Sequence, residues 1–227
     1  MKRILYTIGL LWACAMTQAQ TLLPPVWQGS ADVQYSSRTI AYLPPTRIVW
    51  QETTGSSSIE GIDKLLLPGN GQAELVGGKE CVIRKRPDGK VSVLLDFGRE
   101  LQGGIQIVTG QSSRKEAKVR IRFGESVSEA MCDITPENGA TNDHAIRDFH
   151  FTLPWLGVAE IGNSGFRFVR IDVEEPDIDL LLKEVRATFG YRDIPYLGSF
   201  KSDNDRLNDI WMTGAYTVHL NMQEYIW

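Results

Sequence analysis

The densest group of polar side chains spans residues 142–148, which read NDHAIRD. Carboxylate, imidazole and guanidinium groups this close together, directly before a strand pattern, can bind the hydroxyl groups of a sugar or a calcium ion. Calcium needs several oxygen ligands at loop spacing, and the oxygen donors from Asp133 onward do not fit a recognised calcium loop. We take Asp143, His144 and Arg147 as candidate sugar contacts. The other interpretation is a solvated or interface-contacting loop.

An aromatic side chain, Trp155, follows Pro154 at the end of the next strand pattern. Aromatic faces stack on sugar rings, so Trp155 is the best single candidate for a carbohydrate contact. The alternative is burial in the core or in a domain interface, where large aromatic residues contribute most of their energy.

A third polar group lies in the stretch LDFGRELQGGIQIVTG, residues 95–110, which holds Arg99, Glu100 and Gln102. These side chains can bind sugar hydroxyls. The glycine spacing favours a tight corner between two strands, with the charges solvated or paired across it. Glu125 follows Gly124 at a strand end, and no second carboxylate can be assigned opposite it from the sequence. We therefore interpret both acids as structural and assign no catalytic residue.

The elements that position these groups are predicted to be strands. Residues 80–84 and 91–97 flank Pro87-Asp88-Gly89, a turn sequence, and indicate a hairpin. About eight short strands, with no helix expected before residue 200, favour an all-β fold, an antiparallel, jelly-roll-like β-sandwich. We place this sandwich at residues 46–192, after an extended lead-in at 20–45 with two Pro-Pro pairs and before a linker at 193–201.

The pattern changes at residues 202–227, where apolar residues recur at helical spacing. Ser202 and Asp205 can form a capping box at the start of this helix. Tyr216 and His219 lie largely off the apolar stripe and receive no chemical role. Such an amphipathic helix either begins a further helical domain or packs back on the sandwich as a lid.

The N-terminus is typical of an exported protein. A short positive segment, an apolar run and small residues before Gln20 predict a signal peptide at residues 1–19. The apolar run is too short to span a bilayer; a lipoprotein signal with lipidation of Cys14 is the alternative. Export permits a disulfide between Cys81 and Cys132, but two unpaired cysteines fit the sequence equally well.

Composition excludes other classes of function. The chain of 227 residues has a net charge of −4, and loss of Lys2 and Arg3 with the signal peptide lowers it to −6. No basic stripe interleaves with aromatic residues, so nucleic acid is not expected as a partner. The cysteine and histidine spacing fits no zinc site, and we expect neither a metal nor another cofactor.

Four segments, in order, resemble bacterial α-L-rhamnosidases of glycoside hydrolase family 78: LLDFGRELQGGIQI, VRIRFGESVSEAM, GFRFVRIDV and YLGSFKSDNDRLNDIWMTGAYTVHLNMQE. Together they cover roughly residues 90 to 227. The resemblance implies that the helix begins an (α/α)6 catalytic barrel against which the sandwich packs. It also implies that the whole protein hydrolyses terminal α-L-rhamnosides of rhamnose-containing glycans with inversion.

In that family the catalytic carboxylates belong to the barrel, in an Asp-Gly-x-x-Arg-Asp stretch expected after Trp227, so none can be assigned here. Inverting hydrolysis needs two carboxyl groups separated enough to admit a water molecule. The 227-residue chain is therefore expected to be inactive alone. The rival hypothesis is a self-sufficient, secreted carbohydrate-binding β-sandwich. The amphipathic helix discriminates between them, because a simple binding module does not need one.

Overall fold

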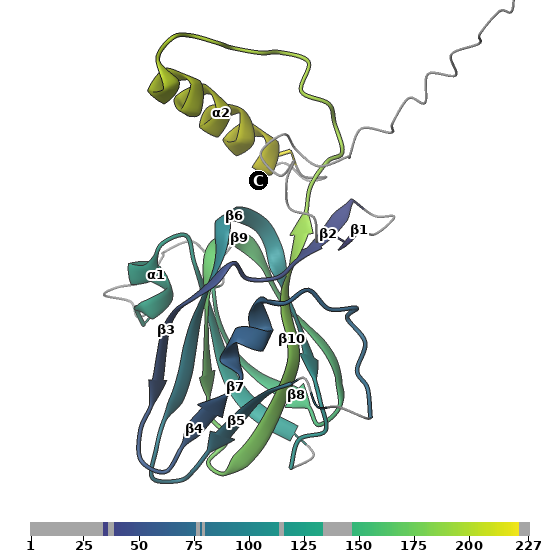
Figure 1. The fold of residues 1–227 in the computed structure, drawn as a ribbon, viewed down its shortest axis with the longest axis vertical. Coiled ribbons are helices and arrows are strands. Elements are labelled where there is room, and N and C mark those ends of the chain that lie inside the picture. Colours follow the sequence, from purple (N-terminus) through teal and green to yellow (C-terminus); the bar gives the residue numbers. More distant parts are fainter. Residues whose placement is uncertain are drawn as a thin grey trace, which may run out of the picture.

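The computed structural model describes residues 34–35, 39–75, 78, 80–113, 116–133 and 147–222. The predicted signal peptide, including Cys14, lies outside these residues. The described chain forms one antiparallel sheet system followed by a single long helix (Figure 1), which confirms the predicted all-β sandwich with a C-terminal helix. Its strands are β1 (Gln34–Tyr35), β2 (Ile40–Leu43), β3 (Arg47–Thr53), β4 (Ser58–Glu60), β5 (Cys81–Lys85), β6 (Val91–Thr109), β7 (Glu116–Gly124), β8 (Asp148–Pro154), β9 (Gly157–Val173) and β10 (Ile178–Gly190).

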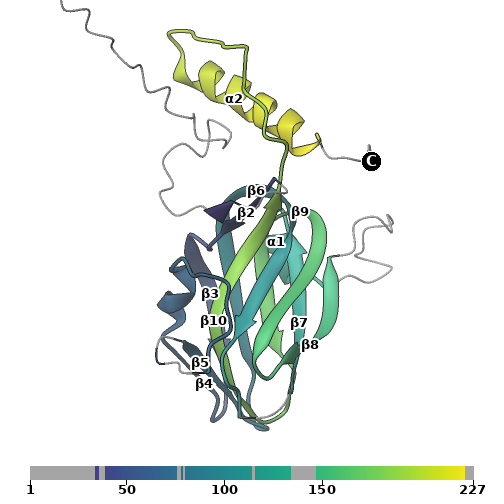
Figure 2. The same cartoon turned by 90° about the vertical axis from the view of Figure 1, so that its right-hand side faces the viewer.

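Two long strands, β6 and β9, pass from one layer of the sandwich to the other. The first part of β6 pairs with β3 and with the end of β9, whereas its last part pairs with β10 and with the start of β9. Strands β7 and β8 extend the first layer, and β2 and β5 flank β10 in the second. Figures 1 and 2 show β6 and β9 bending over the end of the sandwich that lies nearest the C-terminal helix.

The bend in β6 falls in the glycine-rich stretch. The register with β9 shifts between Asp96 and Leu101 and again between Gly103 and Ile105. Gly98 and Gly103 have φ values of 83° and 143°, a region that residues with a Cβ rarely adopt. The prediction of two strands joined by a corner is therefore wrong in one respect, because β6 is continuous for 19 residues.

The predicted hairpin between residues 80–84 and 91–97 is also wrong. The turn itself forms, with the Gly89 N–H donating to the Arg86 carbonyl at 3.1 Å. Its two flanking strands separate, however: β5 pairs with β4 and β10, and β6 pairs with β3. Turn chemistry fixes the chain reversal but not the pairing, because partners distant in sequence compete for both strand edges.

The sheet begins earlier than the predicted lead-in allows. β2 pairs with β10 over four residues, and Ala41 and Leu43 are buried in the core. Part of the segment at 20–45 therefore packs as a strand, against the sequence-based expectation of an unpacked lead-in.

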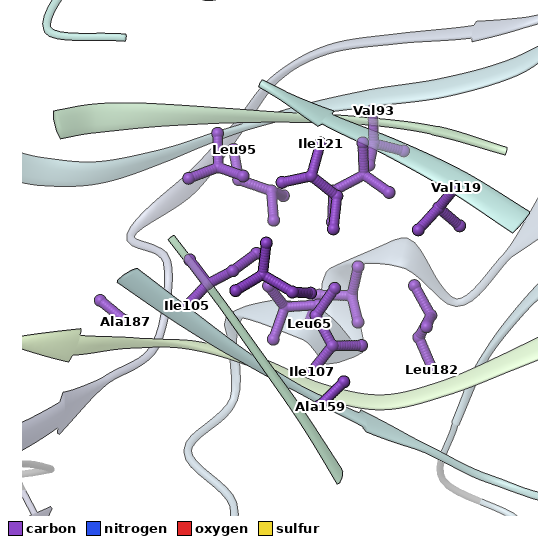
Figure 3. Close-up of a cluster of buried hydrophobic side chains, with 14 of the residues drawn as sticks. Leu65, Val93, Leu95, Ile105, Ile107, Val119, Ile121, Ala159, Leu182 and Ala187 are labelled. Atoms are coloured by element: carbon purple, nitrogen blue, oxygen red, sulfur yellow. The ribbon is translucent and has the colours of Figure 1, made fainter. Parts of the chain in front are cut away.

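The core lies between the two layers and is almost entirely aliphatic and aromatic. Figure 3 shows Leu95 and Ile121 from one layer facing Ile105 and Ile107 from the other. Leu65, from the segment between β4 and β5, packs with them. Each of these five side chains is 0% exposed, which stabilises the fold by roughly 1.5 to 3 kcal/mol per side chain. Phe123 and Phe166 add an edge-to-face contact with ring centroids 5.0 Å apart.

Two short helical segments occur where none was expected. The 3-10 helix η2 (Ile62–Leu66) carries Leu65 into the core, and α1 (Val127–Met131) follows β7. The Ser126 hydroxyl accepts the Glu129 N–H, an N-cap for α1. Both segments are 5 residues long, which is too short for a hydrophobic period to reveal them.

The long helix α2 (Asp205–Leu220) confirms the predicted change of structure, but its cap is Asn204 and not Ser202. The Asn204 side chain accepts the Arg206 N–H at 3.0 Å. Tyr216 and His219, expected off the apolar stripe, are the buried residues of α2. Much of the stripe is instead exposed: Leu207 by 47%, Ile210 by 58% and Val218 by 57%. The helix therefore lies across the end of the sandwich (Figures 1 and 2), and much of its apolar face stays exposed.

Candidate functional site

A cleft of about 940 Å³ separates the bent end of the sandwich from α2. One wall comes from the bend of β6, the residue after β7 and the middle of β9; the other comes from α2. The lining combines apolar surface with acids, bases, amides and hydroxyls: Gly98, Arg99, Glu100, Leu101, Gln102, Glu125, Gly165, Arg167, Asp209, Met212, Thr213, Tyr216, Thr217, Leu220 and Asn221. The stretch at residues 95–110 thus forms one wall of a cleft as well as a bend.

Two carboxyl groups meet in this cleft above Gly165. A Cβ on Gly165 would stand 3.0 Å from Glu100 Oε1 and 3.5 Å from Glu125 Oε1, so both oxygens approach one point. Within the described part of the chain, neither carboxyl group receives a hydrogen bond or forms an ion pair. Burial, and then the neighbouring charge of Glu125, raise the pKa of Glu100 to about 7, although Arg147 and Arg167 oppose this.

The floor of the cleft is held by a buried ion pair. Asp96 is 1% exposed and accepts Arg167 Nε at 2.8 Å, a terminal Arg167 nitrogen at 2.9 Å, Arg47 Nε at 2.9 Å and the Gly98 N–H at 2.7 Å. Burial acts to raise the pKa of Asp96, but these donors outweigh it and hold the pKa below its ordinary value. The carboxylate thereby fixes both the bend of β6 and the Arg167 side chain.

The helix wall is joined to the sandwich by hydrogen bonds. The Tyr216 hydroxyl donates to the backbone carbonyl of Glu100 at 2.5 Å. His219 Nε2 lies 2.6 Å from the Arg192 carbonyl and Nδ1 lies 2.8 Å from the Tyr196 hydroxyl. Because a carbonyl only accepts, Nε2 carries the proton and Nδ1 accepts from Tyr196. The polar residues of α2 thus set its position.

The side chains proposed from the sequence as sugar contacts are not gathered in this cleft. Trp155 lies at the far end of the sandwich, where Gly157 pairs with Thr109, and is 40% exposed. Asp143 and His144 lie outside the described residues. Arg147 forms an ion pair with Glu129 and influences the pKa of Glu100, so it lies near the cleft. Sugar contact by these four residues stays a prediction.

The pairing of Glu100 with Glu125 escaped sequence reasoning, which treated each acid separately. Their meeting depends on two ladders of β9: Gln102 pairs with Gly165, and Gly124 pairs with Phe168. The one local signal was a glycine one or two residues before each acid, Gly98 before Glu100 and Gly124 before Glu125. That signal does not specify which parts of distant strands become neighbours.

A second group of charged side chains covers the outer face of β7 and β9, and its charges are satisfied internally. Arg120 binds Asp148 through two nitrogens, at 2.8 and 2.5 Å. Asp172 accepts from Arg122 at 2.9 Å and from Arg170 at 2.9 Å. The Arg120–Asp148 and Arg122–Asp172 pairs join neighbouring strands, so we interpret this group as structural and the cleft as the candidate site.

Other kinds of site have little basis in the described residues. They contain no group of three or more His, Cys, Asp or Glu side chains arranged to hold a metal ion. Cys81 and Cys132 are free thiols, and burial raises the pKa of Cys81 to about 12, which makes it unreactive. No helix among these residues has the length and hydrophobicity needed to cross a membrane.

Comparison with known proteins shows similarity in fold. No family model matches the chain, and no curated protein is similar to it in sequence. A rhamnosidase from Klebsiella oxytoca with rhamnose bound superposes with a TM-score of 0.57 and 17% identity, over 82% of this chain and 36% of its own. The GH78 family rhamnosidase of Bacillus sp. GL1 gives a TM-score of 0.52 and 17% identity, over 70% of this chain and 15% of its own.

The chain therefore spans well under half the length of either enzyme. Identity this low shows a shared fold, and a shared fold does not by itself assign a function. The structure of this chain is thus that of a β-sandwich region similar to part of two solved rhamnosidases.

Proposed function

We propose that this chain is the N-terminal, non-catalytic part of an exported glycoside hydrolase that resembles α-L-rhamnosidases. The observation that carries the proposal is the superposition on the Klebsiella oxytoca rhamnosidase over 82% of this chain but only 36% of that enzyme. The four sequence segments that resemble the same family, in the same order along the chain, support it independently of the superposition.

The exposed face of α2 supports a helical continuation. Leu207, Ile210 and Val218 are each about half exposed, and Ile210 and Val218 also line an apolar groove of about 470 Å³ between α2 and the segment that precedes it. Contiguous apolar surface of this kind marks an interface more often than a free surface. In this proposal the groove is covered by further helices of the catalytic barrel.

The proposed chemistry is inverting hydrolysis of terminal α-L-rhamnosides. It needs a carboxylic acid that protonates the leaving group and a carboxylate that activates water, about 6.5 to 9.5 Å apart. We assign both roles to the barrel. Glu100 and Glu125 are not offered as this pair, because they approach one point above Gly165 and leave little room for a water molecule between base and sugar.

The proposal is tested by comparing two proteins on an aryl α-L-rhamnoside. One is the product of the complete open reading frame, and the other is the 227-residue chain. The complete product should release the aryl group, with the inverted anomer of rhamnose as the first product by proton NMR, and the shorter chain should not. An open reading frame that stops at Trp227, or hydrolysis by the shorter chain, would refute the proposal.

A stand-alone carbohydrate-binding module is the second candidate. The all-β sandwich favours it, together with the polar side chains Glu100, Gln102 and Arg167 at its bent end, since sugar sites need hydrogen-bonding groups. A glycan array probed with residues 20–200 separates the two, because a self-sufficient module binds glycans without α2. Absence of binding by residues 20–200 would count against the module.

A further inference from the structure

We propose that the cleft between the bend of β6 and α2 binds a neutral sugar unit through the Glu100 and Glu125 carboxyl groups. This inference rests on the proposed function, which places the chain in a sugar-processing protein. It goes further by assigning a ligand site to the cleft that the sandwich forms with α2.

The Glu100 and Glu125 carboxyl groups approach the same point above Gly165. Glu100 is half-buried and Glu125 is exposed, and within the described part of the chain neither carboxyl group accepts a hydrogen bond. The buried carboxylates of Glu80, Asp96 and Glu184, in contrast, each accept at least one backbone or side-chain N–H. The two acids near Gly165 therefore keep acceptor oxygens available to a ligand that displaces water from the cleft.

The groups around the two acids indicate the kind of ligand. A sugar hydroxyl donates to a carboxylate in a short, charge-assisted hydrogen bond. Arg167 uses Nε and one terminal nitrogen on Asp96, which leaves its other terminal nitrogen able to donate to a sugar oxygen. The Thr213 hydroxyl donates to the Asp209 carbonyl and can accept a further hydrogen bond. Asn221, the residue after α2, uses one amide hydrogen on the Thr217 carbonyl and keeps a second hydrogen and its amide oxygen for a ligand. This mixture suits a neutral polyhydroxylated ligand, whereas an anionic ligand would meet two carboxyl groups.

The cleft also has the size and the access that a sugar unit needs. A cleft of about 940 Å³ lies at the upper end of the range for small-molecule sites, roughly 300 to 1,000 Å³. Gly165 has no side chain at the point where the two carboxyl groups meet, and any Cβ there would contact Glu100 Oε1 at 3.0 Å. The glycine therefore keeps both carboxyl groups accessible from the cleft.

The experiment is calorimetric titration of the 227-residue chain with L-rhamnose, L-fucose, D-galactose and D-glucose. We expect saturable binding of at least one sugar in the millimolar range. The double variant Glu100→Gln, Glu125→Gln should weaken it at least tenfold, because a neutral amide accepts more weakly than a carboxylate. Glu116→Gln, at the opposite end of β7 from Glu125, is the matched control and should bind like the parent.

A steric variant checks the same site independently. Gly165→Val should abolish binding by filling the point between the carboxyl groups. Thermal melting of every variant shows whether it is folded; the double glutamine variant, which only removes charge, carries the test should Gly165→Val fail to fold. Saturable binding that persists in the double variant, or no binding of any of the four sugars to the parent, would overturn the inference.

Three further outcomes separate this inference from its alternatives. Binding that appears only with added calcium and is lost with EDTA would overturn it and reassign the acids to a cation site. Hydrolysis of an aryl α-L-rhamnoside by the complete protein, without sugar binding by this chain, would overturn the cleft site and leave the proposed function intact. Sugar binding by this chain without hydrolysis by the complete protein would support the cleft site and refute the proposed function.

Discussion

Replacement of Glu100 by glutamine should stabilise the protein, and only above a defined pH. Burial and the charge of Glu125 raise the pKa of Glu100 from its ordinary value of 4.5 to about 7. In the unfolded chain the carboxyl group loses its proton near pH 4.5, whereas the folded protein keeps it until about pH 7. Between these values the folded state binds more protons, so the free energy of unfolding falls as the pH rises.

The magnitude follows from the size of this change in pKa. It corresponds to an upper limit of about 3 kcal/mol for an isolated, fully buried group. Glu100 is half-buried at the mouth of a cleft, so solvent screening reduces the expected cost of its ionisation to about 1 to 2 kcal/mol. Glutamine has nearly the same shape and never ionises, so Glu100→Gln should recover this amount above pH 7 and nothing below pH 4.5.

The assay is urea denaturation followed by tryptophan fluorescence, from pH 4 to 8.5, with the variant and the parent compared at each pH. The difference in free energy of unfolding should rise between pH 4.5 and 7 and then level off. Glu125→Gln should produce a smaller rise in the same window, because it removes the second cause of the raised pKa. Glu116→Gln, a single carboxylate lost from an exposed strand residue, should change stability by less than about 0.5 kcal/mol.

Two results would refute the reasoning. A Glu100→Gln variant that is less stable than the parent at pH 8 would mean that the ionised carboxylate has favourable partners in solution. A difference that does not change between pH 4.5 and 7 would mean that Glu100 titrates alike in the folded and unfolded chains.

Three other substitutions test the supports of the cleft. Asp96→Asn leaves the Arg167 guanidinium without its buried counter-charge and should lower the free energy of unfolding by about 2 to 4 kcal/mol in urea denaturation at pH 7; a loss below 1 kcal/mol would contradict this. Tyr216→Phe removes the hydrogen bond to the Glu100 carbonyl, about 1 kcal/mol, and should speed protease cleavage in the segment at 193–201; an unchanged cleavage rate would show that the bond does not hold the helix. Gly214→Ala places a Cβ where no other atom lies within 4 Å, so it should raise helix stability by about 0.5 to 1 kcal/mol, measured as a higher melting temperature by circular dichroism; a fall would show that this face is covered in solution.

The sequence by itself determined the class of fold and the type of most elements. Alternation of apolar residues, as in β8, predicts a strand wherever one face is buried. The helical spacing after residue 202 predicted α2, and the turn at Pro87-Asp88-Gly89 was predicted where it forms. These features depend on neighbours within a few residues along the chain, so a local pattern carries enough information to find them.

Strand pairing, the exposed face of α2 and the candidate site were decided by the tertiary structure. β5 and β6 flank a well-formed turn and still pair elsewhere, because other strands occupy their edges: β4 and β10 pair with β5, and β3, β9 and β10 pair with β6. In α2, Ile210 and Val218 of the apolar stripe are exposed, whereas Tyr216 and His219 are buried, since their hydrogen bonds to the sandwich and the preceding segment orient the helix. Glu100 and Glu125 meet only because β9 pairs with both β6 and β7. No local pattern records which distant strands share an edge, and that is why the cleft could not be foreseen from the sequence.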